Sequence, residues 1–331
     1  LLDGCTFWPV IKEVLIKKYQ DRIEEYVVFL KTTKKLFNKM NIRCIVMLYE
    51  TGETEKTILG MNKDKILTIL HQHSFNNFTA KLAKYDWLKI IPIMCNTMTV
   101  YGNIEKIYLT KQQNIDSEKI VITGSPRHDI FFNKQSIGKI KNRKTILITP
   151  VPITDLTGQP TTLLYLKFDE VIKKLFEIIK KLSDVDIVVK LHPSREEHNE
   201  DIGKLIREID PTIPVYHTSP TIIDLLDSSD VLINIQPESF NTSTVLMESF
   251  IREKPTMTIF LDSEYHDLEY VEDGSTLVSD GSDLEKNLQD ILFNKTIRDN
   301  LINNGKIHLQ RCLSNHGTSS EYFAEFLSKH I

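Results

Sequence analysis

The stretch Asp186–Ile209, DIVVKLHPSREEHNEDIGKLIREI, contains a short apolar run, a histidine–proline pair and a helical pattern in immediate succession. The run Ile187–Leu191 is mostly β-branched and predicts a buried strand, which ends at Pro193 because proline has no N–H to donate to a sheet. His192 therefore lies at the carboxyl end of a predicted strand. In open α/β sheets, phosphorylated ligands bind at such strand ends, close to a helix N-terminus.

A helix is predicted directly after this pair. Ser194 and Glu197 have the spacing of a capping box, in which the serine caps the helix and the glutamate reaches back to it. The apolar residues that follow recur every three or four positions, as on the buried face of a helix: Ile202, Leu205, Ile206 and Ile209. Two interpretations of His192 stay open: a phosphate-binding residue, or a strand-end histidine that only hydrogen-bonds its loop.

The same alternation continues through the second half of the chain. Short apolar runs and helical patterns follow one another with short connections, which is typical of a parallel sheet with helices on both faces. The predicted strands are 145–149, 187–191, 215–216, 231–235 and 256–260, the predicted helices are 162–182, 196–209, 222–226 and 244–252, and a helical tail spans 284–329 with breaks at 303–305 and 315–317.

The first half has the same character with weaker signals. Two helical patterns fill residues 8–40, and the apolar runs predict strands at 44–48, 65–70, within 90–99 and at 119–123, with a short helical segment in 100–110. A polar, lysine-rich segment at 133–143 separates the halves, so we predict an N-terminal domain of residues 1–138 and a C-terminal domain of residues 139–331. Because the chain begins with Leu1 rather than methionine, we expect its first domain to be truncated.

Composition excludes several classes of protein. A length of 331 residues suits two domains, and a net charge of −4 gives no overall basic field for nucleic acid. The four cysteines lie far apart without the spacing of metal ligands, which predicts reduced thiols in a cytoplasmic protein. No apolar stretch has the length that a membrane-spanning helix requires.

Five motifs occur in a fixed order along the chain: a strand that ends in Gln72-His73, ITGSPRHD at 122–129, KLHP at 190–193, SSDVLIN at 228–234 and TSTVLMESFIREKP at 242–255. Together they resemble the GT-B glycosyltransferases, and most closely the group of CDP-glycerol glycerophosphotransferases and capsule or surface-polysaccharide transferases. The resemblance covers most of the chain. It implies an α/β protein of two Rossmann-like domains that face a central cleft, with the acceptor on the first domain and a nucleotide-activated donor on the second.

The resemblance also implies roles for individual residues. His73 matches the strand-end histidine of the first domain, although Ser74 stands where the family usually has glycine. His192 and Pro193 match the histidine–proline motif that contacts the donor phosphate. Ser243 matches the hydroxyl at a helix start in the second domain, and Glu248 matches the glutamate of that helix. Both belong to the same nucleotide-binding site.

The chemistry of the second-domain residues agrees with these roles. Thr242, Ser243 and Thr244 come just before a predicted helix, where their hydroxyls either cap the helix or contact phosphate. Glu248 lies one turn after Thr244, where a carboxylate can accept hydrogen bonds from ribose hydroxyls, whereas an ordinary mid-helix glutamate is solvated. Glu238 follows a predicted strand and contacts donor or acceptor unless it too is simply solvated.

In the first domain, His73 is the candidate general base, because an imidazole with a near-neutral pKa can take the proton of an acceptor hydroxyl. His71 competes for this role, and the pair lacks a recognisable third metal ligand. Arg127 and Ser125 of the SPRHD motif are candidate donor-binding residues. Arg127 can bind phosphate bidentately, the alternative being an ion pair at the domain boundary. Asp129 is expected to orient Arg127 or the neighbouring histidine.

We therefore predict a transferase that moves a sugar or glycerol-phosphate unit from a nucleotide-activated donor to a cell-surface polysaccharide or glycolipid precursor, without a metal ion or other cofactor. The expected partners are a nucleotide-activated sugar or CDP-glycerol and a glycan or lipid-linked acceptor, and no nucleic acid. A lipid-linked acceptor would bring the protein to the inner face of the cell membrane. A UDP-sugar 2-epimerase on the same fold and a non-catalytic nucleotide-sugar-binding module are the two alternatives.

Overall fold

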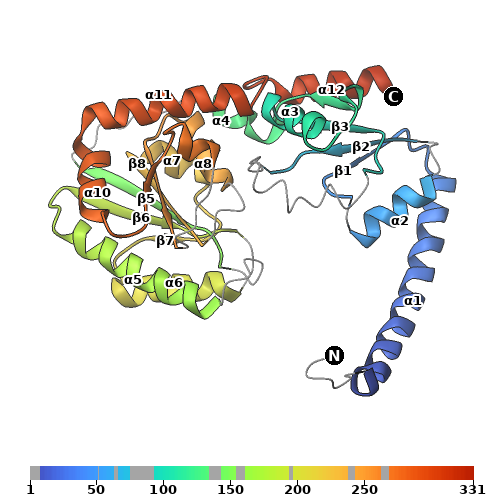
Figure 1. Ribbon diagram of the computed structural model, residues 1–331, viewed down its shortest axis with the longest axis horizontal. Coiled ribbons are helices and arrows are strands. Elements are labelled where there is room, and N and C mark those ends of the chain that lie inside the picture. The colour runs from blue at the N-terminus through green and yellow to red at the C-terminus, as the bar shows by residue number, and fades with distance from the viewer. Residues whose placement is uncertain are drawn as a thin grey trace.

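Two parallel β-sheets, each with helices packed against it, make up the computed structural model (Figure 1). This confirms the α/β architecture of two Rossmann-like units that the sequence predicts. The predicted boundary at 138/139 lies outside the described residues. The structure describes residues 8–50, 52–62, 66–74, 93–133, 143–153, 161–193, 197–237, 243–261 and 268–331.

The second sheet has the strand order β10-β9-β8-β5-β6-β7, and all its neighbouring strands are parallel. The chain enters at β5, builds outward to β7, and returns to the other side of β5 with β8. The order therefore reverses between β5 and β8, and ligands of open α/β sheets bind at the carboxyl ends of the strands on either side of such a point. The strands are β5 (Lys144–Pro150), β6 (Val185–Lys190), β7 (Val215–Tyr216), β8 (Val231–Gln236), β9 (Thr256–Phe260) and β10 (Leu277–Ser279).

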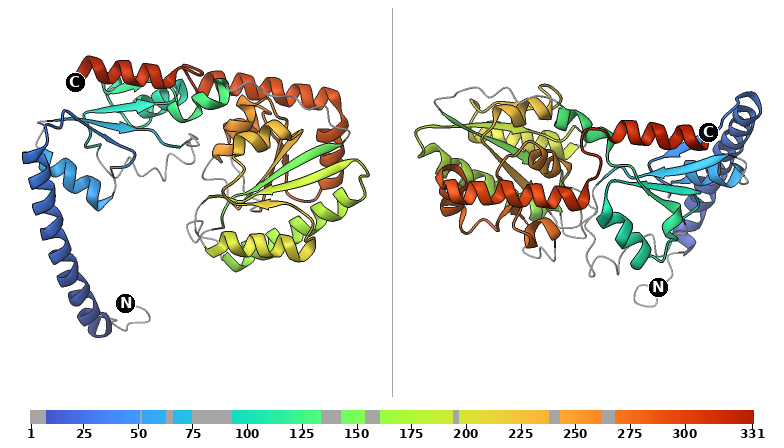
Figure 2. Two further views of the ribbon diagram at one scale, coloured as in Figure 1. Left: turned by 180° about the vertical axis from the view of Figure 1, so that it is seen from behind. Right: turned by 90° about the horizontal axis from the view of Figure 1, so that it is seen from above.

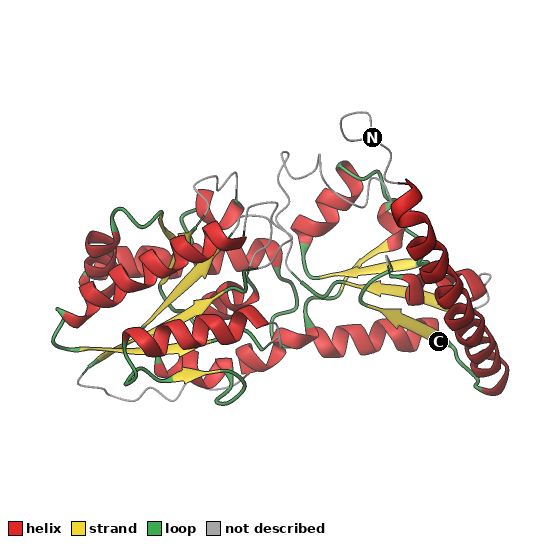
Figure 3. Cartoon of the chain, turned by 90° about the horizontal axis from the view of Figure 1, so that it is seen from below, coloured by secondary structure: helices red, strands yellow, loops and turns green. Residues whose placement is uncertain are grey.

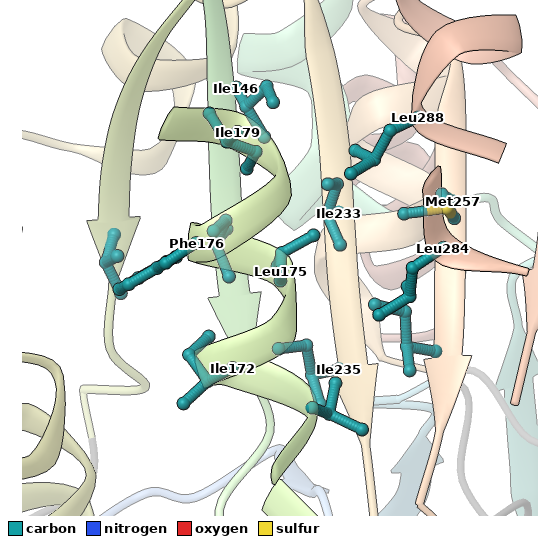
Figure 4. Close-up of a cluster of buried hydrophobic side chains, with 14 of the residues drawn as sticks. Ile146, Ile172, Leu175, Phe176, Ile179, Ile233, Ile235, Met257, Leu284 and Leu288 are labelled. Carbon is teal, nitrogen blue, oxygen red and sulfur yellow. The ribbon is translucent and has the colours of Figure 1, made fainter. Parts of the chain in front are cut away.

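Helices cover both faces of this sheet, because its central strands are buried on both sides and need apolar partners. On one face, α5 (Thr161–Lys180) places Leu175 and Phe176 against Ile146 and Ile233 of the central strands (Figure 4). Each large apolar side chain buried in this way contributes about 1.5–3 kcal/mol. The other helices of this domain are α6 (Glu197–Ile209), α7 (Ile222–Ser228), α8 (Thr244–Ile251), α9 (Glu269–Glu272) and α10 (Leu284–Phe293).

The first sheet is smaller, with four parallel strands in the order β1-β2-β3-β4. Because the strands are parallel, their carboxyl ends all lie at one edge, and the loops that follow them carry the residues singled out above. Its strands are β1 (Cys44–Met47), β2 (Leu67–His71), β3 (Thr97–Val100) and β4 (Ile120–Ile122), and its helices are α2 (Glu53–Asn62), α3 (Asn103–Lys111), α4 (Asp129–Asn133) and the short 3₁₀ helices η3 (Ser117–Lys119) and η4 (Pro126–His128).

The amino-terminal segment forms one helix, α1 (Trp8–Lys39), rather than two. No glycine interrupts the segment, and its only proline is Pro9 in the first turn, where proline is compatible with a helix. The helix extends away from the first sheet (Figure 1). None of the described helices is long and apolar enough to cross a membrane.

The carboxyl-terminal tail forms α11 (Lys295–Cys312) and α12 (Ser319–His330). The predicted break at 315–317 is confirmed, but the predicted break at 303–305 is wrong because α11 runs through it. Gly305 is used for packing instead: a Cβ at this position would lie 3.1 Å from the Phe250 ring of α8. The tail therefore crosses from one domain to the other, with α11 on the second and α12 on the first (Figures 2 and 3).

Polar contacts made by Asp129 and Arg252 tie the first domain to the carboxyl-terminal tail and to the second domain. Asp129 accepts hydrogen bonds from the backbone N–H groups of Ser319 (2.9 Å) and Ser320 (2.7 Å), so it fixes the start of α12. The expectation that Asp129 orients Arg127 or its neighbour is therefore wrong, because both carboxylate oxygens serve a helix N-terminus that is distant in sequence. The buried side chain of Arg252 donates to the Phe131 carbonyl of the first domain (2.8 Å). It also forms an ion pair with Asp227 of its own domain, with a closest N–O distance of 2.6 Å.

Candidate functional site

The loops after β1 and β2 bring His73 against Tyr49, with 4.2 Å between the ring centroids. The His73 ring is half-buried, and burial together with the positive charge of Arg127 lowers its pKa below the ordinary value. A hydrogen bond to the Leu48 backbone opposes this shift. His73 is thus a neutral imidazole at physiological pH, which is the form that accepts a proton.

His71 has a different environment. Its Nδ1 lies 2.7 Å from the Thr99 hydroxyl, and its ring packs on Phe323 of α12 with 4.8 Å between centroids. His71 therefore contributes to the packing between β2, β3 and the last helix. The charge of Arg127 lowers the pKa of His73 and not that of His71. This arrangement favours His73 as the base. Among the described residues, no group of three or more His, Cys, Asp or Glu side chains could hold a metal ion.

The SPRHD motif follows β4 and divides between the interior and the surface. Ser125 is buried, with its hydroxyl 2.6 Å from His128 Nδ1. Burial lowers the pKa of His128 to about 4, so this histidine is neutral. Arg127 points outward, with 59% of its side chain exposed. Ser125 is therefore engaged within the first domain, and Arg127 is the residue of this motif that a ligand can reach.

Arg127 joins the two domains at the candidate site. Its Nη2 lies 3.6 Å from Oε1 of Glu248 in α8, whose side chain is only 4% exposed. Burial raises the pKa of Glu248 to about 7, although Arg127 opposes the shift. Glu248 is thus a buried carboxyl group rather than a solvated one, and the two predicted donor-binding residues from different domains lie side by side.

Two hydroxyl side chains, those of Ser243 and Thr244, lie at the start of α8. Ser243 occupies the N-cap position in extended conformation, and its side chain makes no capping hydrogen bond. Thr244 follows as the first helical residue and is half-buried. Of the two interpretations of the Ser243 hydroxyl, helix capping is therefore not the one the structure shows. Thr242 and Glu238 lie outside the described residues.

His192 and Pro193 come directly after β6, as predicted, and both are exposed. The His192 carbonyl accepts a hydrogen bond from the Asn199 side chain of α6 (3.0 Å), which ties the loop to the helix. Because β6 and β8 flank β5 in parallel, the segments after them lie at the same edge of the sheet. His192 and Ser243 therefore follow strands on the two sides of the point where the strand order reverses.

Sequence reasoning missed several polar residues that shape this region. Gln72, next to His73 in the chain, donates a part-buried hydrogen bond of 2.9 Å to Glu105. Glu50 accepts from the N–H groups of Met94 (3.1 Å) and Cys95 (3.0 Å) and fixes the loop that carries Tyr49. Gln72 was noted only as the neighbour of His73. Glu50 and Glu105 have no sequence signal of their own, because a carboxylate that binds distant groups resembles a solvated one until the chain is folded.

Comparison with known proteins shows what this arrangement resembles. No family model and no curated protein sequence matches the chain. Among solved structures, a glycosyltransferase from Rickettsia africae has a TM-score of 0.57 at 15% identity, over 92% of this chain and 81% of that one. A UDP-GlcNAc 2-epimerase from Neisseria meningitidis, bound to UDP-GlcNAc, has a TM-score of 0.58 at 16% identity, over 91% and 80%.

The wall teichoic acid polymerase TagF is similar as well. Its H444N variant soaked with CDPG has a TM-score of 0.55 at 15% identity, over 86% of this chain and 72% of that chain. These proteins catalyse different reactions on one architecture. The chain therefore has a GT-B-type fold.

Proposed function

We propose that this protein is a cytoplasmic transferase that moves a sugar or glycerol-phosphate unit from a nucleotide-activated donor to a glycan or lipid-linked acceptor. The observation that carries the proposal is the 3.6 Å contact between Arg127 of the first domain and the buried Glu248 of the second. It places a cation from one domain beside the predicted ribose-binding carboxyl group of the other, close to the start of α8.

The donor would bind at the carboxyl edge of the second sheet. The hydroxyl of Ser243 and the N–H groups at the start of α8 would donate hydrogen bonds to a phosphate, with Thr244 beside them. His192, exposed after β6, would contact the same phosphates from the other side of β5. Glu248 accepts from ribose hydroxyls. As the bond to the transferred group breaks, the Ser243 hydroxyl, the helix N–H groups and His192 stabilise the negative charge that develops on the nucleotide. In this proposal no metal ion is required.

The acceptor would bind at the edge of the first sheet. A neutral His73 would take the proton of an acceptor hydroxyl as that oxygen attacks the donor. Its depressed pKa suits this role, because an imidazole held in the basic form is available throughout the physiological pH range. Tyr49 covers one face of the ring and so restricts its orientation. A lipid-linked acceptor would add peripheral association with a membrane surface.

Epimerisation of a UDP-sugar is a second candidate, favoured by the similarity to the UDP-GlcNAc 2-epimerase. The two reactions differ in their need for an acceptor. An epimerase interconverts UDP-GlcNAc and its 2-epimer in the absence of any other substrate, whereas a transferase releases the nucleotide and needs an acceptor for full rate. A binding module without activity would do neither.

The test is to incubate the purified chain separately with UDP-GlcNAc and with CDP-glycerol and to follow the products by ³¹P and ¹H NMR. Slow hydrolysis, with UDP released from the first donor or CMP from the second, that His73→Gln abolishes supports the transferase. Formation of the 2-epimer from UDP-GlcNAc without nucleotide release supports the epimerase. No turnover of either donor, combined with nucleotide binding, supports the binding module.

A further inference from the structure

The side chain of Gln72 lies at the centre of a hydrogen-bond network around the loop that carries His73. Its Oε1 accepts from the backbone N–H of Tyr101 at 2.8 Å. Its Nε2 donates to the carbonyl of Ser74 at 2.9 Å and to Oε1 of Glu105 at 2.9 Å. Both N–H donors and the carbonyl oxygen of one amide are therefore in use, which makes Gln72 the common partner of three separate elements.

The backbone of the same residue is fixed as well. The Gln72 N–H donates to the Thr99 carbonyl at 2.9 Å, which extends the pairing of β2 and β3 by one step beyond the last strand residue. The side chain of Gln72 binds the carbonyl of Ser74, two residues further along the chain. The backbone is therefore held both before and after His73. In this position Ser74 stands where the resemblance leads one to expect glycine, and the bond from Gln72 fixes the direction of its carbonyl.

Glu105 provides a rigid anchor for this network. It lies in the first turn of α3, its side chain is buried, and the N–H groups of Gly102 and of Glu105 itself interact with its carboxyl group. The start of α3 is in turn packed against the end of α11: a Cβ on Gly102 would lie 2.5 Å from the backbone of Cys312. The packing at Gly102 therefore fixes the position of Glu105, and through Gln72 it fixes the loop that carries His73.

We propose that Gln72 is the positioning residue for His73, holding the imidazole against Tyr49 by fixing the backbone on both sides of it. This inference rests on the proposed role of His73 as the base. Misplacing a reacting group by about 1 Å can cost about 100-fold in rate, so loss of a contact behind the base affects the chemical step while the donor site on the second domain stays intact.

The test compares three variants of the full chain. Gln72→Leu removes all three side-chain hydrogen bonds at similar volume, and Gln72→Met is the second version should the branched side chain impair folding. Glu105→Gln is the conservative variant, because its amide oxygen still accepts from Gln72. Gln113→Leu is the matched control: Gln113 also donates a side-chain hydrogen bond in this domain, to the Tyr108 hydroxyl (3.0 Å).

The first readout is the His73 ring itself, followed by ¹H–¹³C NMR of histidine-labelled protein and assigned with His73→Gln. In Gln72→Leu or Gln72→Met we expect the His73 signal to move and its pKa to rise toward the ordinary value, since the ring leaves its half-buried place. Glu105→Gln and Gln113→Leu should leave both unchanged. An unmoved His73 signal and pKa in the folded Gln72 variants would overturn the proposal.

The second readout is hydrolysis of whichever of UDP-GlcNAc and CDP-glycerol the wild type turns over. We expect kcat to fall about tenfold or more in the Gln72 variants, with KM for the donor within about twofold of wild type, and kcat to stay near the wild-type value in Glu105→Gln. A rise in KM alone would contradict a positioning role. If the wild type turns over neither donor, the proposed function fails, and the NMR result still decides whether Gln72 holds His73.

Discussion

Replacing Glu248 with glutamine should stabilise the protein at alkaline pH and change little at acidic pH. The carboxyl group is buried in α8, and its pKa is raised from 4.5 to about 7 chiefly by burial. A group whose pKa is higher in the folded chain binds its proton more tightly there, so folding is penalised once the pH is high enough to ionise it. Glutamine has the same shape and no charge to bury.

The size of the effect follows from the shift. An increase of about 2.5 pKa units corresponds to about 3 kcal/mol of unfolding free energy, because each unit is worth about 1.36 kcal/mol. The penalty is absent below the unfolded-state value of 4.5, grows between 4.5 and 7, and is complete above 7. Glu248→Gln should therefore gain about 3 kcal/mol at pH 8.5 and less than about 1 kcal/mol at pH 4.5.

The assay is urea unfolding at pH 4.5, 6, 7 and 8.5, read from the second domain. Glu177→Gln is the control, because Glu177 is an exposed residue of α5 in the same domain and its replacement removes the same formal charge. Its stability should stay within about 0.5 kcal/mol of wild type at each pH. If Glu248→Gln behaved like Glu177→Gln, or destabilised the domain equally at every pH, the assignment of Glu248 as a buried, proton-binding carboxyl group would be refuted.

Three further predictions concern the domain contacts and the donor site. Asp129→Ala should destabilise the packing of α12 by about 1–2 kcal/mol, because it removes the acceptor of two helix N–H groups; earlier proteolytic cleavage after residue 312 would report this, and unchanged cleavage would contradict it. Arg252→Ala should cost about 3–5 kcal/mol by leaving Asp227, whose side chain is only 12% exposed, without its partner, measured by chemical denaturation; a cost below about 1 kcal/mol would be inconsistent with a largely buried ion pair. Addition of EDTA should leave any nucleotide-dependent rise in Tm unchanged, and its loss on chelation would show that a metal ion takes part.

Much of the second domain could be predicted from the sequence because its central strands are buried on both faces. Such strands must be continuous apolar runs, and the run before His192 therefore indicated both the strand and the position of the histidine at its end. The helix boundary at Gly305 was misjudged for the opposite reason. Glycine usually ends a helix, but here its missing side chain lets α11 approach Phe250, a requirement of tertiary packing that no local pattern contains.

The candidate site was predictable in its residues more than in its contacts. Arg127 and Glu248 were each identified from local motifs, but their approach to 3.6 Å depends on how the two domains pack. Asp129 was assigned to its sequence neighbours, whereas it binds Ser319 and Ser320 almost two hundred positions away. Short polar side chains form bonds to whichever backbone groups the fold brings near, so their partners follow from topology rather than from spacing.

The most direct test of the central claim is a nucleotide titration followed by thermal unfolding. CMP, CDP, UDP, GDP and ADP are compared on the wild type and on His192→Ala, an exposed position whose replacement should not itself affect folding. At about 100 times its Kd, a bound nucleotide adds roughly 2.7 kcal/mol, enough to raise Tm by a few degrees. A rise with one pyrimidine nucleotide that His192→Ala reduces is the result predicted here, and the absence of a rise with all five would contradict a nucleotide-activated donor.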